Sequence, residues 1–283
     1  MSNIFEGYNW PMANPNHKPF AHQIETAEFL VRNPRAFVLN DLGTGKTLSA
    51  LWAADFLMWK GAIKRVLVVG PLSTIHSVWA NEIKANFPHL KYAVAHGNKP
   101  QDRFDAINSN AKIVIMNHDG IKSYNDAVLK GGFDLLIIDE LTAFKTVSTA
   151  RWKAAKKVEK LCKGVWGMSA EPTPNTPVEA FGQAKLVNEK NPFLPKYLTK
   201  FRDLVEIKVA MFTTIPRDDA DKTVHKVLQP AIRFKRDDCV DIPPCQYIDL
   251  EIPLTSNQTK AYKEMYSELL VEYERGEITS ANA

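Results

Sequence analysis

The sequence has 283 residues, enough for one large domain with an appendage or for two small domains. Its hydrophobic fraction of 45% and charged fraction of 24% are ordinary for a globular protein, and a net charge of +4 does not identify a polyanionic partner by itself. The three cysteines form no CxxC pair, and no apolar run approaches the ~20 residues of a membrane helix. These features exclude a disulfide framework and a membrane anchor, and we expect a cytoplasmic protein.

Short apolar runs alternate with segments of helical spacing along the first part of the chain. The runs are near-continuous, which is typical of strands buried on both faces of a parallel sheet. The predicted strands are Ala36–Leu39, Val66–Val69, Tyr92–Ala95, Ile113–Met116, Leu135–Ile138 and Val165–Met168. The predicted helices are Thr47–Trp59, Thr74–Phe87, Asp119–Lys130 and Thr149–Leu161. This alternation predicts an α/β fold, a mostly parallel sheet flanked by helices, with ligands at the carboxyl ends of the strands.

The pattern changes after about Pro177. Residues 178–228 are predicted to be mostly helical, and they are followed by a strand at Tyr247–Ile252 and a helix at about Asn257–Arg275. We therefore expect three segments: a core in 1–177, a helical appendage in 178–228, and a closing segment with a linker in 229–283.

A glycine-rich segment joins the first predicted strand to the first long helix. Its binding residues are expected to be Leu42, Gly43, Thr44, Gly45, Lys46 and Thr47. Glycines let backbone amides approach a phosphate chain, and the helix N-terminus adds positive potential. Lys46 would reach the β- and γ-phosphates of ATP, and the Thr47 hydroxyl would hold Mg²⁺. A glycine-rich turn before a core helix is the simpler alternative, but Gly-Lys-Thr between a strand and a helix favours a P-loop.

An acidic pair, Asp139 and Glu140, directly follows the predicted strand Leu135–Ile138. Asp139 would complete the Mg²⁺ shell, and Glu140 would polarise the attacking water. Acidic residues also gather at ordinary helix N-termini, which is the alternative explanation. The phosphate loop upstream on the same predicted sheet favours the catalytic interpretation.

A third segment, from Lys18 to Gln23, precedes the phosphate loop by about twenty residues. The Gln23 amide can both donate and accept hydrogen bonds, which suits the edge of adenine. Phe20 or Lys18 would pack against the base. The alternative is a helix N-terminus with an exposed glutamine, and the downstream phosphate loop favours adenine recognition.

These segments stand in the order of the first-lobe motifs of superfamily-two helicases, together with Gly70–Ser73 and Met168–Asn175. Lys145 after the acidic pair and the Pro-Thr-Pro-Asn ending of the third motif resemble the Swi/Snf branch. Leu228–Arg236, followed by Ile-Pro-Pro, resembles the passage that closes the first lobe of that branch. The resemblance covers nearly the whole chain.

The resemblance implies a RecA-like lobe of a motor that hydrolyses ATP between two lobes and moves along duplex DNA. Lys46 and Glu140 would then be catalytic. The residues that match DNA-backbone motifs are Pro71, Leu72, Ser73, Asn117 and His118. The residues that match motifs coupling the γ-phosphate to lobe closure are Thr142, Ser169 and Glu171. Backbone contacts predict DNA binding that is sensitive to salt and tolerant of sequence.

The sequence departs from the family pattern at three places. Asn40 replaces the usual first glycine of the phosphate loop, a position that superfamily-two motors commonly relax. Leu141 and Thr142 follow the acidic pair where Ala-His is usual, and the third motif reads Ser-Ala-Glu-Pro where Thr-Gly-Thr-Pro is common. Nucleotide binding should survive these changes, but the coupling between hydrolysis and DNA is expected to differ.

No second Gly-rich lobe and no late arginine-finger motif follow in this sequence, and such an arginine contributes roughly 10³- to 10⁵-fold in rate in related systems. We expect a second RecA-like lobe in cis or in trans, no membrane partner, and weak activity of the isolated chain. The alternative is a free-standing nucleotide-responsive DNA-binding or regulatory module without productive turnover. A P-loop kinase is disfavoured because we find no arginine-bearing lid. The few insertions indicate bacterial or viral host cytoplasm, or the nucleus in a eukaryote.

Two further patterns have a structural and a functional interpretation. Lys153, Lys156, Lys157 and Lys160 share one face of a predicted helix, which indicates a solvated face or, less directly, a DNA-facing stripe. Trp52, Phe56 and Trp59 recur at helical spacing, and we interpret them as core packing behind the phosphate-loop helix.

Overall fold

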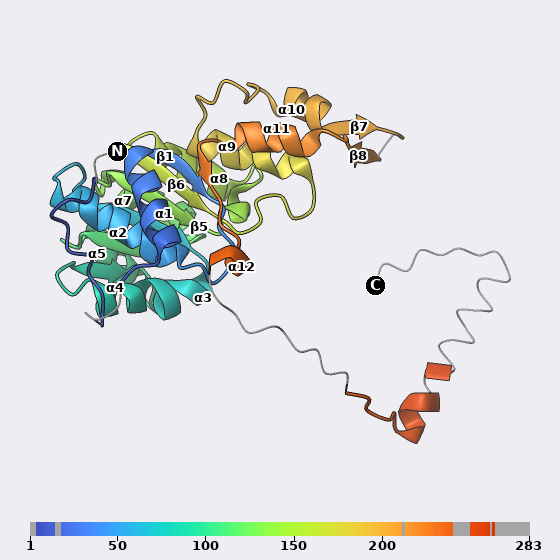
Figure 1. Ribbon diagram of the computed structural model, residues 1–283, viewed down its shortest axis with the longest axis horizontal. Coiled ribbons are helices and arrows are strands. Elements are labelled where there is room, and N and C mark those ends of the chain that lie inside the picture. The colour runs from blue at the N-terminus through green and yellow to red at the C-terminus, as the bar shows by residue number, and fades with distance from the viewer. Residues whose placement is uncertain (1–3, 15–17, 211–212, 240–249, 261, 264–283) are drawn as a thin grey trace. The chain divides into compact units, whose positions relative to one another are not determined.

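The computed structural model describes residues 4–14, 18–210, 213–239, 250–260 and 262–263. It divides into two units, Met1–Asp241 and Ile242–Ala283 (Figure 1). In the second unit, a helix begins at Ser256, and Thr255 caps it because its hydroxyl and backbone N–H both bond with Gln258. Residues 250–252 are not in a strand, so that part of the predicted strand at Tyr247–Ile252 is wrong, and the remainder lies outside the described residues. Most of the predicted helix at 257–275 also lies outside them.

A seven-stranded sheet in the order β3-β4-β2-β5-β6-β1-β9 forms the centre of the first unit. All neighbouring strands in it run parallel. Its strands are β1 (Arg35–Val38), β2 (Val66–Gly70), β3 (Tyr92–Val94), β4 (Ile113–Asn117), β5 (Leu135–Asp139), β6 (Gly164–Met168) and β9 (Ala231–Ile232). The α/β fold and each strand predicted in the first part of the chain are confirmed, and β9 adds an edge strand that was not predicted.

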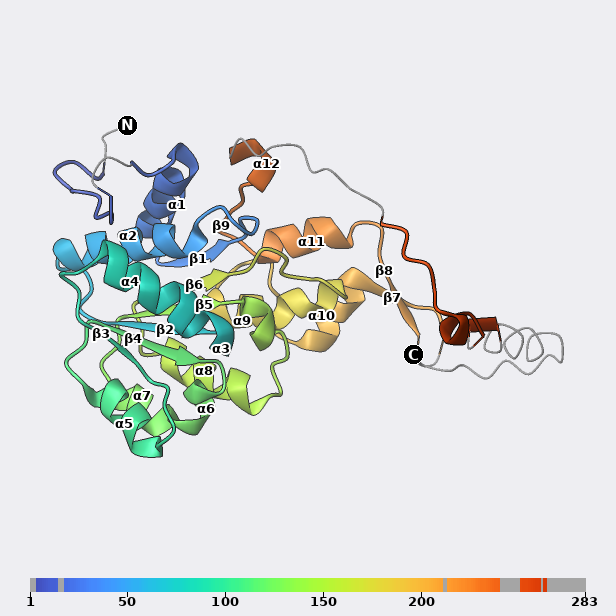
Figure 2. The ribbon, with the colours of Figure 1, turned by 90° about the horizontal axis from the view of Figure 1, so that it is seen from below.

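Helices cover both faces of this sheet, and a buried apolar cluster lies under each layer (Figure 2). The helices of one face are α1 (Ala21–Arg32), α2 (Lys46–Trp59), α3 (Leu72–Thr74), a π-helix (Ile75–Ala80) and α4 (Asn81–Asn86). Those of the other face are α5 (Pro100–Asn108), α6 (Gly120–Ser123), α7 (Asn125–Lys130) and α8 (Ala150–Glu159). Two predicted helices are therefore interrupted, one by the π-helix and the other at Tyr124.

The segment after the third motif adds α9 (Ala180–Val187), α10 (Leu198–Val205) and α11 (Ala220–Val227) to the second face. It also contains an antiparallel hairpin of β7 (Glu206–Lys208) and β8 (Thr214–Pro216), which the helical prediction missed. Short one-turn elements lie at Leu141–Phe144, Pro177–Glu179 and α12 (Arg236–Cys239).

The N-terminal segment packs on the far side of α2. Trp52 and Phe56 are buried there against Phe5 and Trp10, as the interpretation as core packing requires, whereas Trp59 is half-exposed. In the described ranges, no helix is both long enough and apolar enough to cross a membrane.

Candidate nucleotide-binding site

The glycine loop, the acidic pair and the third motif meet at one edge of the sheet. Asp139 is in register with Met168, and Met168 is in register with Val38. Because these strands are adjacent and parallel, the three segments that leave them lie side by side at their carboxyl ends. This edge is where ligands bind in such sheets.

Two left-handed glycines shape the loop between β1 and α2. Gly43 has a φ of +82° and Gly45 a φ of +79°, a region that side chains rarely adopt. A Cβ on Gly45 would also lie 2.2 Å from the Gln23 amide nitrogen. Leu42 and Gly43 are exposed, the Cβ position of Gly45 faces Gln23, and Thr44 is buried and anchors the loop.

The Lys46 ammonium folds back onto its own loop. It donates to the carbonyl oxygens of Asn40 at 2.8 Å and Asp41 at 3.0 Å. Burial lowers the pKa of Lys46, and the nearby carboxylates of Glu140, Asp139 and Asp41 oppose that shift. The lysine therefore faces the acidic pair across the end of the sheet, as a phosphate-binding lysine must.

Asn40, where the family pattern usually has glycine, is a buried connector. Its side-chain amide donates to the Thr26 hydroxyl at 3.0 Å and accepts from the Phe234 backbone N–H at 3.0 Å. The neighbouring Asp41 N–H donates to the Phe234 carbonyl at 2.9 Å. Asn40 thus joins α1, the phosphate loop and the segment that follows β9, a role that sequence reasoning did not find.

The start of α1 touches the phosphate loop. The Gln23 amide donates to the Thr44 carbonyl at 3.4 Å and accepts from the Phe20 N–H at 3.1 Å, and His22 also bonds to Thr44. Phe20 is exposed and stacks on His22. Lys18 lines a different hollow, which includes Tyr8 and Trp59. Of the predicted adenine residues, the structure brings Phe20 and Gln23 to the loop and places Lys18 beside another part of the fold.

The Asp139 carboxylate is buried and already oriented. Its Oδ2 accepts from the Trp79 indole N–H at 2.9 Å and from the Thr74 hydroxyl at 3.5 Å, and its Oδ1 accepts from the Glu140 N–H at 3.2 Å. Trp79 and Thr74 belong to the segment after β2, so that segment fixes the acidic side chain. No pattern in the sequence predicted this support.

Glu140 adopts a left-handed backbone with a φ of +51°. Such strain in a residue other than glycine persists only where the surroundings impose it, and it clusters at functional sites. Burial and the Asp139 carboxylate raise the pKa of Glu140, and Lys46 opposes the rise. The site therefore contains a glutamate with a strained backbone and a raised carboxyl pKa, opposite Lys46 of the loop.

The third motif begins directly at the end of β6. Ser169 is buried, its backbone N–H donates to the Val38 carbonyl at 3.1 Å, and its hydroxyl donates to the Glu171 carbonyl at 3.1 Å. Glu171 is exposed. Thr142 lies on the short turn after the acidic pair, and in the described part of the chain its hydroxyl contacts neither Ser169 nor Glu171 through a hydrogen bond.

A histidine from the end of β4 lies on the acidic segment. Nε2 of His118 is 2.7 Å from the Asp139 carbonyl oxygen, and the ring packs edge-on against Phe144. Nε2–H donates this bond because a carbonyl oxygen can only accept, and burial lowers the pKa of His118. Leu72 and Ser73 are exposed just beyond β2, and Asn117 is partly exposed at the end of β4. His118 differs from them because its ring turns inward.

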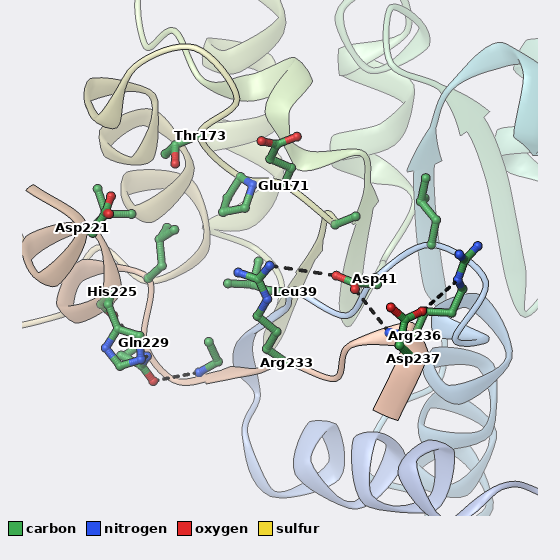
Figure 3. A pocket seen from close by; sticks show the side chains of 16 residues that line it. Leu39, Asp41, Glu171, Thr173, Asp221, His225, Gln229, Arg233, Arg236 and Asp237 are labelled. Atoms are coloured by element: carbon green, nitrogen blue, oxygen red, sulfur yellow. Dashed lines mark hydrogen bonds and ion pairs between the residues drawn. The ribbon is translucent and has the colours of Figure 1, made fainter. Parts of the chain in front are cut away.

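A hollow of about 900 Å³ opens beside the phosphate loop (Figure 3). Its walls come from the loop, the third motif, α11 and the segment after β9. The Arg233 guanidinium lies 3.9 Å from the Asp41 carboxylate, and the backbone N–H of Arg236 donates to the same carboxylate at 3.2 Å. Sequence reasoning placed these arginines in the closing passage but did not assign them to the site.

The donor set fits a magnesium ion bound together with phosphates. In the described residues, the Thr47 hydroxyl has no hydrogen-bond partner, and no three acidic, histidine or cysteine side chains gather as a metal cage. Mg²⁺ usually takes one or two protein oxygens and fills the rest of its shell with water and substrate phosphates.

Comparison with known proteins extends these observations. Residues 22–282 match the model of the SNF2-related domain. The ATPase core of a Swi2/Snf2 protein from Sulfolobus solfataricus, solved in complex with dsDNA, superposes with a TM-score of 0.67 at 18% identity, covering 94% of this chain and 55% of that chain. The fold is therefore that of a Swi2/Snf2 ATPase core.

Curated relatives are considerably longer than this chain. The chain is 29% identical over 188 residues to the uncharacterized ATP-dependent helicase YqhH of Bacillus subtilis, covering 65% of this chain and 32% of the relative. It is 24% identical over 173 residues to the RNA polymerase-associated protein RapA of Stutzerimonas stutzeri, covering 58% of this chain and 18% of the relative. The loops described above lie within the matched family range, and the chain belongs to the SNF2-related domain family of ATP-dependent helicases.

Proposed function

We propose that this chain is the ATP-binding lobe of a motor that couples ATP hydrolysis to movement along duplex DNA. The observation that carries the proposal is the placement of Lys46 opposite Asp139 and Glu140 at the carboxyl edge of the sheet. A structural helix N-terminus would not explain the strained glutamate, the buried aspartate and the lysine together.

The residues of the loop divide the work of holding the nucleotide. The amides from Gly43 to Lys46 would wrap the phosphates, and Lys46 would exchange its two carbonyl partners for phosphate oxygens. The Thr47 hydroxyl and the Asp139 carboxylate would hold Mg²⁺, which supplies charge neutralisation at the phosphates. Glu140 would orient and polarise the attacking water.

Adenine would lie against the start of α1. Phe20 offers an exposed ring, and Gln23 holds both that segment and the loop through its amide. Because both ends of the Gln23 amide are already bonded, we assign it to shaping the pocket as much as to reading the base. Lys18 would reach the base only if its segment moved toward the loop.

The DNA-contacting surface would run over the ends of β2 and β4. Pro71, Leu72 and Ser73 leave β2 at the same edge as the nucleotide loop, and Asn117 ends β4. A protein with this fold was solved in complex with dsDNA, which supports duplex DNA as the polymer that this surface contacts. His118 would link that surface to the acidic segment, because its ring bonds to the Asp139 carbonyl.

The third motif would relay the state of the γ-phosphate. Glu171 lines the hollow that the phosphate loop and α11 also line, and Ser169 bonds to its carbonyl oxygen. Thr142 lies in the turn that directly follows Glu140. A second RecA-like lobe, in cis or in trans, would close over this edge and supply the arginine that stabilises transition-state charge.

The test is ATP hydrolysis with and without duplex DNA, by this chain alone and mixed with a second RecA-like lobe. We expect slow turnover alone and DNA-stimulated turnover with both lobes, which Lys46→Ala abolishes. Nucleotide and DNA binding without stimulated turnover in any combination would contradict the motor and favour a nucleotide-responsive binding module.

A further inference from the structure

The lysines of α8 do not share one environment, although their spacing predicted one face. Lys156 is mostly buried, and its ammonium lies 2.8 Å from the Lys185 carbonyl, 3.0 Å from Glu159 and 2.8 Å from Glu189. It therefore fastens α8 to α9 and is not available to a ligand. The interpretation as a uniform stripe is wrong at this position.

Two of the other lysines line a hollow on the opposite flank of the helix. Lys153 and Lys157 lie there with Lys122 of α6, around a volume of about 490 Å³. All three side chains are exposed, and within the described ranges none of them forms an ion pair. One carboxylate, Asp126, also lines the hollow, so the three ammonium groups leave a positive excess.

The hollow is built rigidly onto the end of β4. The Arg151 guanidinium pairs with Asp119 at 2.8 Å, and the Asn125 amide donates to the Ala154 carbonyl at 3.2 Å. These contacts join the helices that carry the three lysines, and α6, α7 and α8 pack against one another (Figure 2). The position of the lysines relative to Asn117 is therefore fixed by the fold.

We propose that this lysine hollow, defined by Lys122, Lys153 and Lys157, is a further contact site for backbone phosphates of duplex DNA. The inference rests on the proposed function, because it takes the polyanion to be the duplex that crosses Ser73 and Asn117. Lysines act on phosphates as point charges without reading bases. Lys122 lies in α6, which follows β4 directly and contacts both β4 and α8.

The proposal also gives a reason for three exposed lysines around one hollow that Asp126 alone lines with a carboxylate. Like charges held around one hollow repel each other, and the phosphates of a duplex relieve that repulsion while they release condensed counterions. An acidic peptide would offer a similar charge, but nothing places it next to the β4 end, so duplex DNA is the occupant that the position favours.

The experiment compares two triple variants of the full chain with equal loss of charge. One removes the hollow, Lys122→Ala, Lys153→Ala and Lys157→Ala. The control removes three exposed lysines without ion pairs in the described residues, Lys64→Ala, Lys84→Ala and Lys91→Ala; Lys64 and Lys91 stand just before β2 and β3, at the amino edge. Fluorescence anisotropy of a labelled duplex gives the dissociation constant over a series of salt concentrations.

Each phosphate contact contributes about 0.9 to the slope of log affinity against log salt. We expect the hollow variant to reduce that slope by up to ~2.7 and to weaken binding about tenfold or more at ~0.1 M salt. The control should change the slope by much less, and both variants should keep the wild-type melting temperature because the six lysines are exposed.

The outcomes separate this inference from the proposed function. Equal slopes for the two variants, with wild-type binding intact, would overturn the lysine hollow and leave the motor proposal standing. A hollow variant that loses affinity for a labelled poly-glutamate peptide but not for the duplex would overturn it as well. No duplex binding by the wild-type chain at low salt would overturn both.

Discussion

Asn40 shows how one side chain can replace a glycine at the entrance to a phosphate loop. Its buried side-chain amide donates to the Thr26 hydroxyl and accepts from the Phe234 N–H. Its backbone carbonyl accepts a hydrogen bond from the Lys46 ammonium. A glycine here would leave the Thr26 hydroxyl and the Phe234 N–H without these partners. Asn40 therefore links the loop to the segment that follows β9.

Removal of this amide should loosen the loop. We expect Asn40→Ala to lower the free energy of unfolding by about 1–3 kcal/mol, because it leaves buried polar groups unpaired. Thermal unfolding measures the stability, and a fluorescent ATP analogue measures the affinity.

The hydrogen bonds of Asn40 also predict an effect on nucleotide affinity. If Asn40 positions the loop, Asn40→Ala should weaken nucleotide affinity more than a control of equal stability loss elsewhere in the core, such as Ile107→Ala in α5. Equal affinities for the two variants would show that Asn40 serves stability alone.

At the scale of elements, the turn after the acidic pair is packed directly against α9. Lys145 pairs with Glu179, and a Cβ on Gly182 would lie 2.1 Å from the Lys145 carbonyl oxygen. A backbone carbonyl cannot rotate away as a side chain can. The close approach of α9 thus fixes the segment that carries Glu140 and Thr142.

Gly182→Ala should therefore push α9 away from this turn. We expect the free energy of unfolding to fall by several kcal/mol, since overpacked cores lose roughly 1–3 kcal/mol of stability and occasionally more. Gly97→Ala is the control, because its added methyl would meet only the exposed Asp102 side chain, which can move. Similar melting temperatures for the two variants would contradict the rigid contact.

The same scale shows what sequence patterns can predict. The strands β1, β2, β4, β5 and β6 are nearly continuous apolar runs, and burial on both faces of a parallel sheet makes such runs recognisable. The strand β3 is short and only partly buried, but it lies within the apolar run that ends at Ala95. The strands β7, β8 and β9 have only two or three residues, which is too short for a period to appear. The π-helix after β2 was not predicted, because six residues are too few for its wider turn to show in the apolar spacing.

The candidate site divides in a similar way. Gly43, Lys46, Asp139 and Glu140 are recognisable because phosphate chemistry restricts their types and spacing. The partners that orient them are not, because they come from distant segments: Phe234 is 194 positions from Asn40, and Trp79 is 60 positions from Asp139. Such contacts become visible only once the fold brings the segments together.

At the scale of the whole molecule, one lobe carries the nucleotide loop, the acidic pair and the third motif on one sheet edge. The chain spans about a third of YqhH and about half of the structure of the Sulfolobus ATPase core. In the proposed motor, coupling to DNA would depend on what meets this edge, while binding of magnesium and triphosphate would depend on the edge itself. That binding is the step on which the other proposals rest.

The measurement that tests it most directly is the affinity of a fluorescent ATP analogue with Mg²⁺ and with EDTA, for wild type, Lys46→Ala and Asp139→Asn. We expect Mg²⁺ to tighten wild-type binding about tenfold or more, a gain of at least ~1.4 kcal/mol. Lys46→Ala should weaken binding in both conditions, and Asp139→Asn should remove only the Mg²⁺-dependent part. The account would be contradicted if the wild-type affinity were the same with Mg²⁺ and with EDTA, or if Asp139→Asn bound the analogue like wild type. Either result would mean that no metal–triphosphate is held between the lysine loop and the acidic strand end.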